Sequence, residues 1–152
     1  MTEDPLYRRA ILRLASDAAG AGHLAAPDAA ATLHNTACGD RVTVELGLAQ
    51  GRVSALAHQT QACVLTQASA ALLAAQGLGQ DRAGLARLTE AVQAMLAGGP
   101  APAGYEAFDG VGEHAGRHVC VLLPLRAALA AFEQAEEGAE RSQGQADTVQ
   151  PG

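Results

Sequence analysis

The chain has 152 residues, a formal net charge of -6 and a pI near 5.2. This acidity argues against a nucleic-acid-binding surface, and the length fits one domain with a substantial core. Hydrophobic residues make up 49% of the chain but aromatic residues only 3%, so we expect a core built mainly of Ala, Leu and Val. No run of 18 or more apolar residues occurs, and we therefore expect a cytoplasmic protein without a membrane span.

Lysine is absent from the chain, and all 10 basic side chains are arginines. A P-loop with its phosphate-binding lysine, a Schiff-base enzyme and a kinase-type lysine are therefore excluded. No GxGxxG motif follows a predicted strand. Nucleotide chemistry is not expected.

The first predicted element is a helix that begins at Asp4-Pro5, which suit the N-cap and the first helical position. Gly20 and Gly22 follow its last apolar residue and end it. The apolar positions with helical spacing are Leu6, Tyr7, Ala10, Ile11, Leu14 and Ala18.

Three strands are predicted next, at about residues 31–35, 42–48 and 52–60. In the second, apolar side chains at positions 42, 44, 46 and 48 alternate with Arg41, Thr43, Glu45 and Gly47, a pattern typical of a strand with one buried face. Gln50-Gly51 supplies a turn to the third strand. The simplest arrangement is a small antiparallel meander.

The apolar period changes to about 3.6 from Cys63 onward, which predicts one helix up to Gly77 and another from Asp81 to Gly98. A loop then runs to about residue 116, with Tyr105, Phe108 and Val111 as anchors. The last helix contains Pro124, so we expect it to start close to Cys120 or to kink.

These elements predict an α+β fold, in which a three-stranded antiparallel sheet packs against about four to five helices. We expect a single domain over residues 1–140. Residues 141–152 are polar and poor in bulky apolar side chains, which favours a disordered tail.

Three cysteines carry the strongest functional signal: Cys38 in a turn before a strand, Cys63 at the start of a helix, and Cys120 near the start of the last helix. Asp40 follows two residues after the first of them. In a reducing compartment, an odd number of cysteines favours reactive or metal-binding thiols over disulfides. Three thiolates and a carboxylate suit zinc or an iron–sulfur cluster. The alternative, that the cysteines are small buried apolar residues, stays open.

Segments 35–40, 62–72 and 117–123, taken in this order, resemble the U-type iron–sulfur cluster assembly proteins, the family of IscU, SufU and the N-terminal domain of NifU. Residues 6–12 are also similar to the first helix of that family. The resemblance covers roughly residues 6–133. It implies a fold of the SufE/NifU-like architecture.

The resemblance further implies a ligand set of Cys38, Asp40, Cys63 and Cys120, which would hold Zn²⁺ or an iron–sulfur cluster, [2Fe–2S] rather than [4Fe–4S]. The implied function is that of a scaffold. Such a scaffold receives sulfur from a cysteine desulfurase, SufS-like or similar, and passes clusters to apo-protein acceptors. Neither a nucleic acid nor a membrane is an expected partner.

Two other functions remain open beside the scaffold. The long separation of Cys63 from Cys120 and the position of Arg117 resemble SufU-like members, in which zinc-dependent sulfurtransferase activity would place the persulfide sulfur on Cys38 with support from Arg117. The second open function is that of a degenerate interaction module without chemistry. Whether the chain is an enzyme therefore stays open. Val119 stands where the family has His or Lys, and His118 is a candidate ligand or proton donor.

Overall fold

The structure analysed is a computed structural model that describes residues 8–37 and 39–149, with side chains as far as residue 138. Cys38 and the predicted helix start at Asp4-Pro5 lie outside the described residues. The fold is α+β, as predicted: the described residues form one three-stranded antiparallel sheet and four α-helices, with three short 3₁₀ turns.

The sheet consists of β1 (Ala29–Asn35), β2 (Asp40–Ala49) and β3 (Arg52–Gln61), in the order β1-β2-β3. Both neighbouring pairs are antiparallel, which confirms the meander. Gln50 and Gly51 form the two-residue turn between β2 and β3, and both have positive φ, as tight hairpin turns require. β1 and β3 therefore both end beside the start of β2, at the same end of the sheet.

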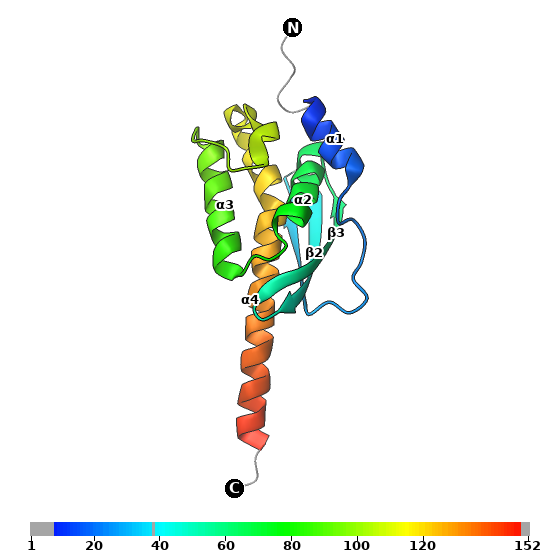
Figure 1. Ribbon diagram of the computed structural model, residues 1–152, viewed down its shortest axis with the longest axis vertical. Helices are drawn as coiled ribbons and strands as arrows, with labels where there is room; N and C mark the ends of the chain where they lie inside the picture. Colours follow the sequence, from blue (N-terminus) through cyan, green and yellow to red (C-terminus); the bar gives the residue numbers. More distant parts are fainter. Residues whose placement is uncertain (1–7, 38, 150–152) are drawn as a thin grey trace.

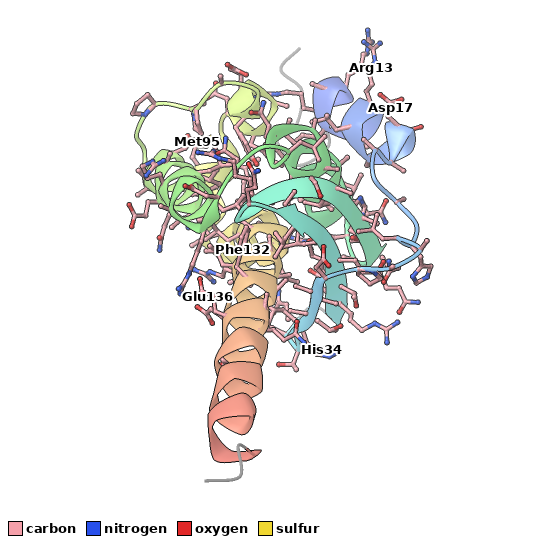
Figure 2. All side chains as sticks on the ribbon, turned by 60° about the horizontal axis from the view of Figure 1, so that its bottom comes forward. Arg13, Asp17, His34, Met95, Phe132 and Glu136 are labelled. Atoms are coloured by element: carbon pink, nitrogen blue, oxygen red, sulfur yellow. The ribbon has the colours of Figure 1, made fainter. Side chains whose placement is uncertain are left out.

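One face of the sheet is buried and the other is open to solvent. The alternation in β2 confirms the predicted buried face as far as Leu46, because Val42, Val44 and Leu46 are each 0% exposed. It ends at the irregularity between Gly47 and Leu48, where Gly47 is buried and Leu48 is only half-buried. On the open face, Thr32 and Thr43 join their hydroxyls across β1 and β2 at 2.7 Å, and His34 points away from the helices (Figure 2). An antiparallel sheet tolerates this arrangement because only one of its faces has to be apolar.

The helices cover the buried face (Figure 1). They are α1 (Arg9–Asp17), α2 (Val64–Gln76), α3 (Arg82–Leu96) and α4 (His118–Val149). α4 packs along β1 and β2, α2 packs on β3 and α4, and α1 and α3 flank them on α2 and α4. Ala68, Ala70 and Ala128 are fully buried, which agrees with the core of Ala, Leu and Val expected from the composition.

The segment between α3 and α4 is more regular than the predicted loop. It forms three 3₁₀ turns, η2 (Tyr105–Phe108), η3 (Val111–Glu113) and η4 (Ala115–Arg117). The three predicted anchors Tyr105, Phe108 and Val111 are at most 1% exposed. Their burial holds a Gly- and Pro-rich segment against the domain and thereby fixes the point at which α4 begins.

α4 begins at His118 and accommodates Pro124 in its second turn without ending. A proline lacks the N–H that would otherwise bond the carbonyl four residues earlier, here that of Cys120. At the same turn, the buried Ser69 of α2 donates a 2.6 Å hydrogen bond from its Oγ to the carbonyl oxygen of Val121. The start of α4 is therefore tied to α2 by a side chain.

The far part of α4 extends beyond the domain body, and the helix continues through residues 141–149, for which disorder was expected (Figure 1). Phe132 and Ala135 are the last residues of α4, among those with described side chains, that pack on the core. That the folded domain comprises residues 1–140 stays a prediction.

The segment Ala115–Gly138 is long and apolar enough to cross a membrane by length and composition alone. However, 56% of its most apolar 18-residue stretch is buried inside the domain. This burial is what the core helix of a folded domain requires, since its apolar side chains face the sheet and the other helices.

His58 ties the chain that follows α1 to the edge of the sheet. It is 4% exposed, and its two ring nitrogens contact the carbonyl oxygen of Ala19 at 2.8 Å and Oγ1 of Thr60 at 2.9 Å. Its backbone N–H donates to the carbonyl of Gly20, and its own carbonyl accepts from Gly22 N–H. Residues 19–22 thereby cover part of the edge of β3.

Burial lowers the pKa of His58 below its ordinary value of 6.5, and the hydrogen bond to Ala19 opposes this only in part. The folded state therefore favours the neutral ring. The resulting stability is complete above about pH 6.5 and is lost as the pH falls through the lowered pKa.

We expect the free energy of unfolding, measured by urea denaturation, to fall less between pH 7 and pH 5 in His58→Gln than in the wild type. His34→Gln, at an exposed position, should show the same change in the free energy of unfolding between pH 7 and pH 5 as the wild type. An equal change in the wild type and in His58→Gln would contradict the prediction.

Candidate metal centre

Three elements bring potential metal ligands to one end of the domain. Asp40 is the first residue of β2, Cys63 is the N-cap of α2, and Cys120 is the third residue of α4. One ligand atom from each, a carboxylate oxygen and two Sγ atoms, all lie within 4.8 Å of one another. Asp40 and Cys120 are 80 positions apart in the chain, so only the fold brings them together. This group can bind a metal ion.

Asp40 is the centre of the group and is only 3% exposed. Its Oδ1 accepts the backbone N–H of Cys63 at 3.3 Å, and its Oδ2 accepts the hydroxyl of Thr66 at 3.3 Å. The thiol of Cys120 lies 3.5 Å from the same Oδ2. The carboxylate therefore caps the N-terminus of α2, where the positive end of the helix dipole favours a negative charge.

The two described cysteines differ in accessibility. Cys120 is 0% exposed, whereas Cys63 is half-buried. The Sγ of Cys63 also lies 3.5 Å from Oγ1 of Thr66. Thiolate and carboxylate donors fit zinc and iron, and in such a site the metal replaces the thiol protons.

An open depression of about 640 Å³ leads from solvent to this group. Asp40 and Cys63 line it, together with Arg117 of η4, whose side chain carries a positive charge. The remaining lining residues are Gly39, Gln61 and Ala62. Cys63 can therefore be reached from solvent, while Cys120 stays covered.

The predicted site residues are thus brought together in part. Asp40, Cys63 and Cys120 converge, and Arg117 lies at the same depression. Cys38 lies outside the described residues, so its place in the ligand set stays a prediction. His118 contacts the carbonyl of Gly112 through its Nε2 at 2.7 Å, and it is not a member of the metal-ligand group among the residues described.

Sequence reasoning missed Thr66, whose buried hydroxyl touches two members of the group. The available signal was its position: it lies three residues after Cys63, on the same face of a helix that is otherwise mostly apolar. A hydroxyl at this spacing points back toward the N-cap.

The chain resembles known proteins over most of its length. Residues 6–114 match the family described as NifU-like N terminal domain. The crystal structure of a nitrogen-fixing NifU-like protein (N-terminal) from Brucella abortus is 37% identical, with a TM-score of 0.82 over 88% of this chain and 96% of that one.

A second solved structure shares the fold at lower identity. It is a SufU described as a putative iron–sulfur cluster assembly scaffold protein for the SUF system of Fervidobacterium islandicum, 20% identical, with a TM-score of 0.76 over 84% of this chain and 96% of that one. No curated protein matches the chain. That the chain is closest to SufU-like members stays a prediction, since identity this low shows only the fold. The family match over residues 6–114, the 37% identity and the convergent Asp40, Cys63 and Cys120 agree that the chain belongs to the NifU-like N-terminal domain family of U-type scaffold proteins.

Proposed function

We propose that this domain is an iron–sulfur cluster assembly scaffold, which holds a nascent cluster, preferably [2Fe–2S], through Asp40, Cys63, Cys120 and Cys38. The observation that carries the proposal is the convergence of one carboxylate and two cysteine sulfurs within 4.8 Å at one end of a NifU-like fold. Cys38, which precedes Asp40 by two residues in the sequence, would complete the set.

The mixed donor set suits a protein that must release what it binds. A carboxylate oxygen binds iron and zinc less tightly than a thiolate sulfur because these metals favour softer ligands. Asp40 is held by two donors of α2, so it can rejoin its own hydrogen bonds when the cluster leaves. Cluster release to an apo-protein acceptor would therefore begin at this ligand.

Sulfur would arrive as a persulfide from a cysteine desulfurase. A scaffold thiolate attacks the outer sulfur of the donor's Cys–S–SH, a new S–S bond forms on the scaffold, and the donor cysteine leaves as a thiolate. An external thiol supplies the two electrons that reduce this sulfur to sulfide before it joins ferrous iron. Cys38 is the proposed acceptor, and Arg117 at the depression would stabilise the negative charge of the reacting sulfurs.

A zinc-dependent sulfurtransferase is the second candidate. Three thiolates and one carboxylate also satisfy the tetrahedral preference of zinc, and the exposed approach to Cys63 and Arg117 would serve sulfur transfer equally well. In that case zinc stays on the protein and Cys38 leaves the metal to accept the persulfide sulfur. The third candidate, an interaction module without chemistry, predicts neither metal binding nor sulfur acceptance.

One anaerobic assay separates these functions. The protein is incubated with a cysteine desulfurase, cysteine, ferrous iron and a thiol, and then with an apo-ferredoxin. A scaffold should develop visible absorption and pass its cluster to the acceptor. If zinc instead persists and desulfurase turnover rises without cluster formation, the sulfurtransferase is correct, and if nothing changes, both functions fail. A cytoplasmic location would suit either function.

A further inference from the structure

The hydroxyl of Thr66 lies between two of the potential metal ligands. Thr66 is 0% exposed and stands in the first turn of α2. Its Oγ1 lies 3.3 Å from Oδ2 of Asp40 and 3.5 Å from Sγ of Cys63. Neither the family resemblance nor the pattern of charged residues assigns a role to Thr66.

A hydroxyl has one hydrogen, so it can donate to only one of these two neighbours at a time. The contact with Asp40 has Thr66 as its donor, which leaves the hydroxyl lone pairs directed at Cys63. The backbone N–H of Cys63 holds the other carboxylate oxygen. Two donors from α2 thus fix the orientation of a carboxylate that comes from β2.

Burial makes this hydroxyl hard to replace. Thr66 is 0% exposed and Asp40 only 3% exposed, so little solvent can reach the contact between them. If the hydroxyl were removed, Oδ2 would lose a donor that solvent does not supply, and the carboxylate would turn toward its remaining partners. Ligands of metals are oriented by such outer partners, whose loss weakens metal binding.

We propose that Thr66 is a positioning residue, which orients Asp40 as the oxygen ligand and thereby sets how tightly the site holds a metal. This inference rests on the proposed function because it takes Asp40 to be a ligand. It goes further in assigning the strength of that ligand to a hydroxyl on α2.

The test uses Co²⁺ alone as a probe, because thiolate–cobalt absorption reports both binding and coordination geometry. Thr66→Val keeps the shape of the side chain and removes the hydroxyl. We expect Co²⁺ affinity to fall about 10–100-fold and the visible ligand-field bands to shift. Thr66→Ser restores the hydroxyl and should recover the wild-type spectrum, whereas Thr66→Ala should behave like Thr66→Val.

Two controls separate positioning from general destabilisation. Thr89→Val removes another buried hydroxyl, which donates to the carbonyl of Leu85 in α3, and it should leave Co²⁺ affinity unchanged. In an Asp40→Ala background, Thr66→Val should have no further effect on affinity, because its action passes through the carboxylate. Thermal unfolding of each metal-free variant shows that the comparison is made between folded proteins.

The possible outcomes are distinct. Unchanged affinity and spectrum in both Thr66→Val and Thr66→Ala would overturn the role of Thr66 while leaving the proposed function intact. An equal loss with and without Asp40 would also overturn it, since Thr66 would then act independently of the carboxylate. If the wild type itself binds no Co²⁺ and assembles no cluster, the proposed function fails.

Discussion

Cys63→Ala protein is expected to lose stoichiometric metal binding. Cys63 provides one of two described thiols within 4.8 Å of the Asp40 carboxylate, and without it the proposed set loses one of the thiolates that neutralise the charge of the metal. Because a direct ligand is lost, affinity should fall by more than the roughly 100-fold upper limit for outer-shell partners. Competition with a coloured zinc chelator measures the change.

His118→Gln is the matched comparison for this prediction. His118 is also a potential ligand by type and lies close to Cys120 in sequence, yet its Nε2 contacts the carbonyl of Gly112. We expect His118→Gln to retain metal binding. Loss of zinc in His118→Gln but not in Cys63→Ala would reverse the assignment of the site.

The largest effect on stability is expected for Leu125→Ala. Leu125 lies on α4 and is 0% exposed, so its truncation removes apolar contacts and leaves a cavity in a core whose neighbours are packed. Such substitutions cost about 2–5 kcal/mol, a large share of the roughly 5–15 kcal/mol that stabilises a domain. Urea denaturation followed by circular dichroism measures this loss.

Leu78→Ala tests whether burial causes that loss. The chemical change is identical, but Leu78 is 51% exposed, and exposed substitutions usually alter the free energy of unfolding by less than about 0.5 kcal/mol. Equal destabilisation by the two substitutions would contradict the assignment of Leu125 to the core and of Leu78 to the surface.

The sheet and the helix order could be predicted from the sequence because their signals are local. Alternation from Val42 to Leu48 and the turn residues Gln50 and Gly51 specify the central hairpin without reference to the rest of the chain. The 3₁₀ turns before α4 were predicted as loop, since they depend on burial of Tyr105 and Phe108 by distant elements. Pro124 left the course of α4 open for the same reason: tertiary packing decides whether a helix continues past proline.

The ligands of the site could be predicted from the sequence, but the hydrogen bonds that hold them in place could not. Asp40, Cys63 and Cys120 were identified by residue type and by the resemblance, and the structure brings them together. The hydroxyl of Thr66 and the tie between Ser69 and the carbonyl of Val121 join α2 to other elements. Contacts of this kind leave no periodic pattern, because one partner is a distant residue or a backbone atom.

The central claim is that Asp40, Cys63 and Cys120 form the binding site of an iron–sulfur scaffold. Its most direct test is the iron, acid-labile sulfide and zinc content of protein isolated anaerobically after desulfurase-driven assembly. Iron and sulfide in equal amounts, lost in Cys63→Ala, are the predicted result. Protein that contains no iron and sulfide after assembly, with or without zinc, or that keeps its full iron and sulfide without Cys63, would contradict the claim.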